Sequence, residues 1–451
     1  MAKSFSLSPN QGWIAVFVPA LLYYIFLSPT KTPLLSYLNL LPSYFPLETT
    51  LILENGINDE IKKIFDSKNN FEIVIEDEDA SFYDTTWVED TELGRGYLLI
   101  SDSSSNGKVW RYEMGGGIIP IGKSLYLDQS GCRSGHINEC DGSSLHLGSK
   151  GLAVQVTKDE ERFDIGLLLI AEKGEKRIIR LENDGARTPL VLDVPSLCDD
   201  GKTFHRLQNP GQVVYTPFGD LLFTEREECH QQEVEGGKSI SFVKTGIYRV
   251  KDVVNIPSIP FKNSRDAHQW TLKEMIEQHV EVTIDVPYSN LGDVSDVLIG
   301  KEMTSIYIST RKPNHNGCTH FIHKIEEDID SESTETKDIS KLPIFFDMTK
   351  FYEMPNSCSE GKTFLTIDDK GNLFATFPGG LVIIDKDGDH LATINFQYSD
   401  QSSLSTKIQA TSLTIANDGY MYLTTESKLL RLKLKSKMLN HPTNMIVPKR
   451  K

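Results

Sequence analysis

The chain has 451 residues, with 63 acidic against 47 basic side chains, a formal net charge of −16 and 39% hydrophobic residues. This composition is that of a globular protein and excludes both a disordered chain and a protein with many membrane spans. The acidic balance would repel phosphate backbones, and no basic patch with interleaved aromatic residues occurs. Nucleic acid is therefore set aside as a partner.

The N-terminal segment is hydrophobic. No charged residue occurs between Lys3 and Lys31, and the stretch from Trp13 to Leu27 is almost wholly apolar. We expect residues 1–30 to be a transmembrane signal anchor, which would bind the membrane and hold the remainder in the lumen of the secretory pathway or outside the cell. The alternatives are a cleaved signal peptide, which would make the protein secreted, and a buried N-terminal segment.

Six cysteines occur, at positions 132, 140, 198, 229, 318 and 358. An even number suits an oxidising lumen and permits up to three disulfides. The pairing cannot be read from the spacing, although Cys132 and Cys140 could close a small local loop.

One phrase recurs along the body of the chain. It consists of a strand, a turn with glycine or acidic residues, a second apolar strand that ends in Ser, Thr or an acid, and a third apolar strand, usually with a basic residue at its centre. The second and third strands of the six copies are 96–102 and 108–113, 166–172 and 176–182, 219–225 and 246–250, 305–310 and 321–325, 371–377 and 380–385, and 419–425 and 428–434.

Six small antiparallel sheets in one chain predict an all-β fold, a six-bladed β-propeller, because radial packing buries both faces of each sheet and leaves short edges. A stack of separate sandwiches is the alternative. We expect the propeller to cover residues 81–436, preceded by a linker and lead-in at 31–80 and followed by a basic tail at 437–451. Helices should be few, with Glu60–Ser67 and Trp270–Gln278 the best candidates.

In a propeller, the segments that lead into the innermost strands meet around the central channel. Here these segments are 82–87, 209–212, 292–296 and 359–363. Their carboxylates and amides suit a hard divalent cation.

Several stretches resemble the family of gluconolactonase, senescence marker protein and luciferin-regenerating enzyme. The most specific are NPGQVVYTPFGDLLFTE (209–225) and DDKGNLFATFPGGLVIIDKDGDHLATI (368–394), and the resemblance extends over roughly residues 80 to 435. It implies a six-bladed propeller with one central divalent ion, Ca²⁺ or Zn²⁺, which polarises a lactone or ester carbonyl while an acidic side chain activates water.

Carried onto this chain, the family's ligand positions fall on residues of altered type. The first ligand, a glutamate before a tryptophan, corresponds to Asp84 near Trp87. The second motif falls on Pro210-Gly211-Gln212, where the amide ligand position is Gly211 and Gln212 or Asn209 could substitute for it. The third motif falls on Val294-Ser295-Asp296, and the fourth, which is both ligand and general base, on Thr363 or Glu360.

The resemblance thus implies Asp84, Asp296, Glu360 and Gln212 as metal ligands, with Glu360 as the catalytic base. His205 and Arg206, just before the second of these loops, are candidates for binding an anionic substrate. We expect a metal-dependent hydrolase of a small lactone or ester. The alternatives are a non-catalytic lumenal propeller that binds a partner, and a propeller enzyme similar to strictosidine synthase or the arylesterases.

Arginines recur at one position of the third strands, at 111, 180, 249 and 431. Because equivalent positions recur in each blade, we expect these side chains to pair with neighbouring acids as part of the framework.

Overall fold

The computed structural model describes most of residues 48–436. Outside its description are the two ends, the longer internal segments and gaps of one to four residues; the longer stretches are 1–47, 53–58, 66–70, 114–121, 131–147, 156–166, 233–238, 257–283, 327–336, 353–360, 398–407 and 437–451. The predicted signal anchor, the helix predicted at 270–278, Cys132 and Cys140 all lie outside the described residues. Among the described helices, none combines the length and the hydrophobicity that a membrane span needs.

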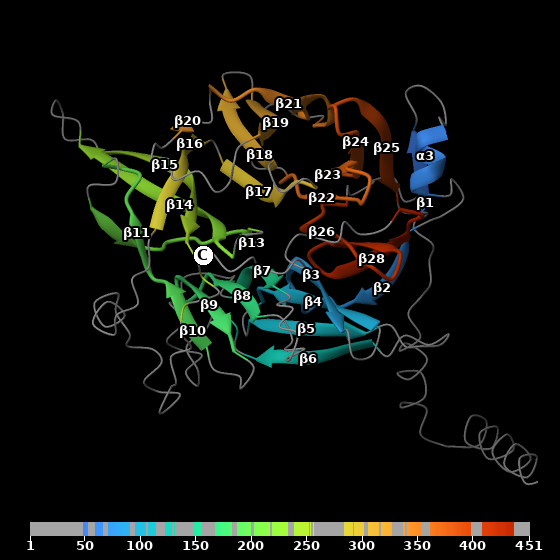
Figure 1. Cartoon of the computed structure of the whole chain (residues 1–451), viewed down its shortest axis with the longest axis horizontal. Coiled ribbons are helices and arrows are strands. Elements are labelled where there is room, and N and C mark those ends of the chain that lie inside the picture. The colour runs from blue at the N-terminus through green and yellow to red at the C-terminus, as the bar shows by residue number, and fades with distance from the viewer. Residues whose placement is uncertain are drawn as a thin grey trace, which may run out of the picture. The chain divides into compact units, whose positions relative to one another are not determined.

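Pro46–Lys451 form one compact unit, and its sheets radiate from a common centre (Figure 1). The innermost strands of successive sheets contact one another in the order β3, β7, β13, β17, β22, β26 and back to β3. The ring is therefore closed, and the predicted six-bladed β-propeller is confirmed.

Blades 1 to 3 follow chain order from the centre outwards. Blade 1 contains β3 (Phe82–Asp90), β4 (Arg95–Asp102), β5 (Lys108–Glu113) and β6 (Gly122–Asp128); blade 2 contains β7 (Ser149–Gln155), β8 (Leu167–Glu172), β9 (Arg177–Leu181) and β10 (Arg187–Val191); blade 3 contains β13 (Val213–Tyr215), β14 (Leu221–Gln232), β15 (Ser239–Val250), β16 (Ile284–Leu291) and β20 (Lys337–Asp338). A separate two-stranded sheet, β11 (Asp193–Pro195) and β12 (Phe204–Arg206), lies in sequence between blades 2 and 3.

Blades 4 to 6 complete the ring. Blade 4 contains β17 (Asp293–Ile299), β18 (Ser305–Asn314), β19 (Gly317–Glu326) and β21 (Ile344–Asp347), followed by a 3₁₀ turn, η4 (Thr349–Phe351); blade 5 contains β22 (Leu365–Ile367), β23 (Leu373–Phe377), β24 (Gly380–Ile384), β25 (His390–Gln397) and β1 (Glu48–Ile52); blade 6 contains β26 (Ser412–Ile415), β27 (Tyr420–Thr424), β28 (Lys428–Lys433) and β2 (Glu72–Glu76).

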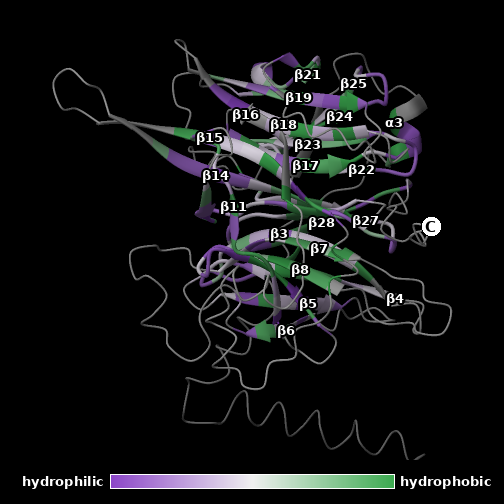
Figure 2. Cartoon of the chain, turned by 60° about the vertical axis from the view of Figure 1, so that its left-hand side comes forward, coloured by the Kyte–Doolittle hydropathy of each residue, from purple (hydrophilic) through white to green (hydrophobic). Residues whose placement is uncertain are grey.

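The hydrophobic core consists of six clusters, each between two adjacent blades. Strands in the middle of a blade are covered on both faces, and every residue of β23 and β24 is buried. This explains why these strands read as unbroken apolar runs. Figure 2 shows the same distribution, with hydrophobic residues concentrated in the blades and the long β14–β15 hairpin projecting beyond its neighbours.

In three blades, the recurring phrase contains the same turn between the first and second strands. Gly219, Gly371 and Gly419 have φ angles of 86°, 89° and 85° in blades 3, 5 and 6. Each donates its N–H to the carbonyl oxygen three residues earlier. Because only glycine adopts this left-handed conformation without strain, the sequence must repeat glycine at this point in each of these blades.

Residues before the first blade close the ring. β2 pairs with β28 as the outermost strand of blade 6, and β1 pairs with β25 at the edge of blade 5. Both strands fall in the range 31–80 that the sequence assigns to a lead-in. The short helix α3 (Asp59–Ile64) begins one residue before the predicted helix and packs Ile61 and Ile64 into the core between blades 5 and 6.

Cys198 and Cys229 form a disulfide that joins the segment after β11 to β14. Cys318 is also disulfide-bonded. The oxidising compartment expected from the even number of cysteines stays a prediction.

The recurring arginines pair with acids, as predicted, in three blades. Arg111 pairs with Glu113, and Arg431 pairs with Glu72 at 2.7 Å. Arg180 pairs with Glu182 at 2.8 Å, and both side chains are buried.

Candidate functional site

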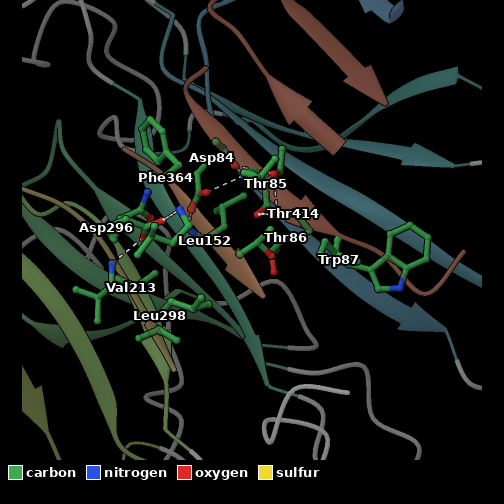
Figure 3. A pocket seen from close by; sticks show the side chains of 18 of the residues that line it. Asp84, Thr85, Thr86, Trp87, Leu152, Val213, Asp296, Leu298, Phe364 and Thr414 are labelled. Carbon is green, nitrogen blue, oxygen red and sulfur yellow. Dashed lines mark hydrogen bonds between the residues drawn. The ribbon is translucent and has the colours of Figure 1, made fainter. Parts of the chain in front are cut away.

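The innermost strands surround a cavity of about 150 Å³ at the centre of the ring. Its lining comes from all six blades and includes Asp84, Thr85, Thr86, Trp87, Leu152, Gln212, Val213, Val214, Asp296, Val297, Leu298, Phe364, Leu365, Thr366, Ile367, Ser412, Leu413, Thr414 and Ile415. Figure 3 shows Asp84 and Asp296, from β3 and β17, among these side chains. The cavity has room for one small molecule and brings together residues that are far apart in the sequence.

Asp84 is a buried carboxyl group that links two blades. Its Oδ1 accepts the N–H of Thr85 at 2.8 Å, and its Oδ2 accepts the N–H of Leu152, in blade 2, at 2.8 Å. Burial raises the pKa of Asp84 to about 7, although these hydrogen bonds oppose the rise. A carboxyl group with this pKa can both accept and donate a proton near neutral pH.

Asp296 repeats this arrangement on the opposite side of the ring, in blade 4. Its Oδ1 accepts the N–H of Val297 at 2.8 Å, and its Oδ2 accepts the N–H of Leu365, in blade 5, at 2.7 Å. Burial raises the pKa of Asp296 well above its usual value, and the negative charge of Asp84 raises it further. The two carboxyl groups therefore interact electrostatically across the cavity.

Hydroxyl groups fill the seam between the last blade and the first. The Thr85 hydroxyl lies 2.7 Å from the Ser412 hydroxyl and 2.9 Å from the Thr414 hydroxyl. Gln212 is 7% exposed and lines the cavity from blade 3, and its main-chain N–H donates to the Thr224 hydroxyl at 3.0 Å. The wall of the cavity thus carries carboxyl, amide and hydroxyl oxygens, together with apolar side chains.

A second polar group lies where the innermost strands begin. Tyr83, Lys150 and Lys362 come directly or almost directly before the cavity residues Asp84, Leu152 and Phe364. Lys362 Nζ donates to the Tyr83 hydroxyl at 3.0 Å, and Lys150 Nζ lies 5.5 Å from the centre of the Tyr83 ring. Tyr83 of blade 1 thus reaches lysines of blades 5 and 2 at this end of the channel.

Glu225 lies next to this group and is 1% exposed. Its Oε1 accepts the N–H groups of Gln208 and Asn209 at 2.8 and 2.9 Å, and its Oε2 has no hydrogen-bond partner within the described residues. Burial raises the pKa of Glu225 to about 7. Asn209 connects it to Lys150, because the Asn209 Oδ1 accepts a hydrogen bond from Lys150 Nζ at 2.6 Å.

Of the six site residues predicted from the sequence, three line the cavity: Asp84, Asp296 and Gln212. Glu360 lies outside the described residues, so its roles as ligand and base stay predictions. His205 and Arg206 lie in β12, where the His205 ring is 3.3 Å from Glu227 and Arg206 donates to the Glu175 carbonyl at 3.3 Å. Neither belongs to the described lining of the cavity.

Sequence reasoning did not single out Tyr83, Lys150, Lys362 or Glu225. A signal was present for three of them: Tyr83 and Lys362 stand in segments that lead into inner strands, and Glu225 ends one copy of the recurring phrase. Lys150 carried no comparable signal.

The cavity carries oxygen donors of the kind that a divalent ion needs. Each carboxylate oxygen of Asp84 and Asp296 accepts one main-chain N–H, which leaves further lone pairs for a cation. Carboxylate and amide oxygens are the donors that a hard cation prefers. Asp84, Asp296 and Gln212 therefore fit such an ion in chemical type.

Three potential ligand atoms lie within 4.8 Å of one another at another place among the described residues, in Cys198, Glu227 and Cys229. The two sulfur atoms are joined in the disulfide. This group is therefore structural, because a metal would require the free thiolates.

Comparison with known proteins shows the fold. No known family model matches the sequence, and no curated protein matches it. Among solved structures, the chain is similar to a structural-genomics target assigned as a gluconolactonase, with a TM-score of 0.50 and 15% identity over 87% of this chain and 100% of that one. It is similarly close to a gluconolactonase from Xanthomonas campestris, with a TM-score of 0.50 and 14% identity over 87% of this chain and 97% of that one.

At this level of identity, the likeness establishes a shared six-bladed architecture. The resemblance to gluconolactonases that the sequence suggested is confirmed for the fold.

Proposed function

We propose that the protein is a hydrolase of small lactones or esters and that the reaction takes place in the central cavity. The observation that carries the proposal is the pair of buried carboxyl groups, Asp84 and Asp296, in a cavity at the centre of a propeller. Strongly shifted pKa values in a concave site are typical of groups that transfer protons. The gluconolactonase structures that share this fold support the substrate class.

The reaction requires a water molecule to attack the carbonyl carbon while the ring or ester C–O bond breaks. In the absence of a bound ion, Asp84, with a pKa of about 7, can take the proton from this water and return it to the departing alkoxide oxygen. When Asp84 is a ligand of a bound ion, Glu360, the base predicted from the sequence, would perform this step instead. The products are a carboxylate and an alcohol.

We propose that Asp84, Asp296 and Gln212, with Glu360, hold a divalent ion, Ca²⁺ or Zn²⁺. When bound, such an ion would polarise the carbonyl group. The two aspartate side chains are held in place, because each accepts hydrogen bonds from two main-chain N–H groups on adjacent blades. Substrate would therefore meet oxygen donors that are already in position.

We also propose that the protein works in an oxidising compartment, either secreted or held at the membrane by the segment around residues 13–27. The Cys198–Cys229 disulfide and the disulfide-bonded Cys318 support this location. Protease protection of the propeller in sealed microsomes tests it, and propeller that is digested without detergent would contradict it.

The substrate class is tested by a panel assay on the purified wild-type protein. Five- and six-membered sugar lactones, aryl esters and a peptide are followed by acid release, after chelation and after Ca²⁺ or Zn²⁺ is restored. We expect acceleration above buffer for at least one small lactone or alkyl ester, none for the peptide, and a loss of rate on chelation. A protein that accelerates aryl esters alone would favour the arylesterase alternative, and one that accelerates nothing would favour the binding-module alternative.

A further inference from the structure

We propose that Lys150, Lys362 and Tyr83 form a binding site for the carboxylate group of a small organic acid, at the end of the channel where the innermost strands begin. The three residues come from blades 2, 5 and 1, so only the closed ring brings them together. They adjoin the cavity in sequence but are not part of its described lining.

Lys150, Lys362 and Tyr83 together have several unused hydrogen-bond donors within the described residues. Lys362 Nζ donates to the Tyr83 hydroxyl at 3.0 Å, and Lys150 Nζ donates to Asn209 Oδ1 at 2.6 Å. An ammonium group has three N–H donors, and the Tyr83 hydroxyl retains its own O–H after accepting from Lys362. Within the described part of the chain, two donors on each lysine and one on the tyrosine are unused.

Lys150 is also buried. The residue is only 9% exposed, so few water molecules can reach its side chain to accept hydrogen bonds. Among the described residues, neither Lys150 nor Lys362 has a carboxylate within ion-pair distance. Burial makes the charged form of such a lysine costly, so a bound anion would stabilise the ammonium group.

The charges around Lys150 are mostly positive. The chain carries a net charge of −16, yet Lys150 experiences repulsion from Lys362 and Lys173. Glu225 and Asp293 are the acids that face it, but Asp293 is paired with Arg311, and the pKa of Glu225 is raised to about 7. Positive charge therefore predominates at this end of the channel in an otherwise acidic protein.

The donor set favours a carboxylate over a phosphate. Two ammonium groups and one hydroxyl match the two oxygens of a carboxylate. Phosphate sites commonly add an arginine fork or a row of main-chain N–H groups, and Arg311, a guanidinium whose charge acts on Lys362, is paired with Asp293. If the proposed function is taken as given, the substrate would be a lactone or ester that carries a free carboxylate group. This identification of the substrate rests on the proposed function, whereas the binding site itself does not.

The affinity of the site should increase as the pH falls. Burial, followed by the charges of Lys362 and Lys173, lowers the pKa of Lys150 well below its usual value, while Glu225 and Asp293 act in the opposite direction. Acidification therefore adds a proton to Lys150 and removes the negative charge of Glu225, and both changes favour a bound anion.

The test is calorimetric titration of the full chain at low ionic strength with acetate, glutarate, inorganic phosphate and the neutral amide of glutarate. The protein variants are wild type, Lys150→Met, Lys362→Met and Tyr83→Phe. The control is Lys386→Met, which changes a lysine whose side chain is 70% exposed in a turn of blade 5. Methionine keeps most of the unbranched apolar stem of lysine and removes the ammonium group, and each variant is first checked for an unchanged circular dichroism spectrum.

We expect wild type and Lys386→Met to bind the carboxylates alike, and either central lysine variant to bind them about 10- to 100-fold more weakly, the usual effect of losing a charge-assisted hydrogen bond. Tyr83→Phe should lose less. Wild type that binds no carboxylate, or a Lys386→Met variant that is as impaired as Lys150→Met, would overturn the proposal, and tighter binding of phosphate would overturn its ligand class.

These acids contain no bond for the protein to hydrolyse. Carboxylate binding without lactone hydrolysis would therefore contradict the proposed function and leave this binding site intact. Lactone hydrolysis without carboxylate binding would overturn the binding site and leave the proposed function intact.

Discussion

The wild-type protein, freed of divalent ions by chelation, should lose stability as the pH rises from about 5 to about 8, and Asp84→Asn should lose less. In the folded protein the pKa of Asp84 is about 7, against 3.8 for the free side chain. The folded state therefore binds a proton that the unfolded state has released. Its stabilising contribution is complete below the unfolded pKa and is lost as the pH rises through the folded pKa.

The size of this effect follows from the shift. One pKa unit corresponds to about 1.4 kcal/mol, so Asp84 alone should account for roughly 2–3 kcal/mol of the loss between these pH values. Asp296 adds to it in the same direction, because its pKa is also raised. Urea unfolding at several pH values, with and without chelator, measures the slope.

A control variant and a bound divalent ion distinguish the titration of the cavity carboxyl groups from other causes of a pH-dependent stability. Asp385→Asn is a matched control, because Asp385 also accepts two main-chain N–H groups, from Asp387 and Asp389, but lies in a turn away from the cavity. It should leave the pH slope unchanged. A bound divalent ion should flatten the slope, since it favours the charged carboxylates; a wild-type slope that equals that of Asp84→Asn under chelation would contradict the electrostatics of the cavity.

Arg180→Met should be among the most destabilising single substitutions outside the cavity. Arg180 is 2% exposed, and its guanidinium donates to Glu182 Oε1 at 2.8 Å and to the carbonyl oxygens of Val253 and Ile256 at 2.8 and 2.7 Å. It thus ties blade 2 to the chain segment that follows β15. Methionine would leave the buried Glu182 carboxylate and two carbonyl groups without this partner.

Removal of one partner from a buried ion pair typically costs about 3–5 kcal/mol, and we expect a loss in this range from chemical unfolding. Arg431→Met is the matched control, because Arg431 occupies the equivalent strand of blade 6 and pairs with Glu72, whose side chain is 50% exposed. It should cost about 1 kcal/mol or less. Equal losses for the two variants would show that burial does not determine the strength of these pairs.

Much of the propeller could be predicted because one local feature repeats. The glycine turns at Gly219, Gly371 and Gly419, each followed by an apolar strand, mark blades 3, 5 and 6 in the sequence. The edge strands β1 and β2 could not be found in this way, since they come from outside the repeated phrase. They join blades 5 and 6 through pairing with residues more than 300 positions away.

The candidate site could be predicted only where sequence position determines geometry. Asp84, Gln212 and Asp296 stand where inner strands begin, and the ring places all three in the cavity. His205 was expected near the channel because it precedes Asn209, but the β11–β12 hairpin directs it towards Glu227. Lys150 was missed because a lysine normally stays in water, and nothing in the local sequence shows that three blades bury it.

The most direct test of the hydrolase proposal is the initial rate of lactone ring opening by wild type and by the double variant Asp84→Asn/Asp296→Asn, with Asp385→Asn as the control. All three are compared under conditions where urea unfolding shows them to be folded. We predict that wild type and Asp385→Asn accelerate the reaction above buffer, and that the double variant is slower by at least about 100-fold, the scale of losing a central catalytic group. A double variant as fast as wild type, or a wild-type rate equal to that in buffer, would contradict the proposal.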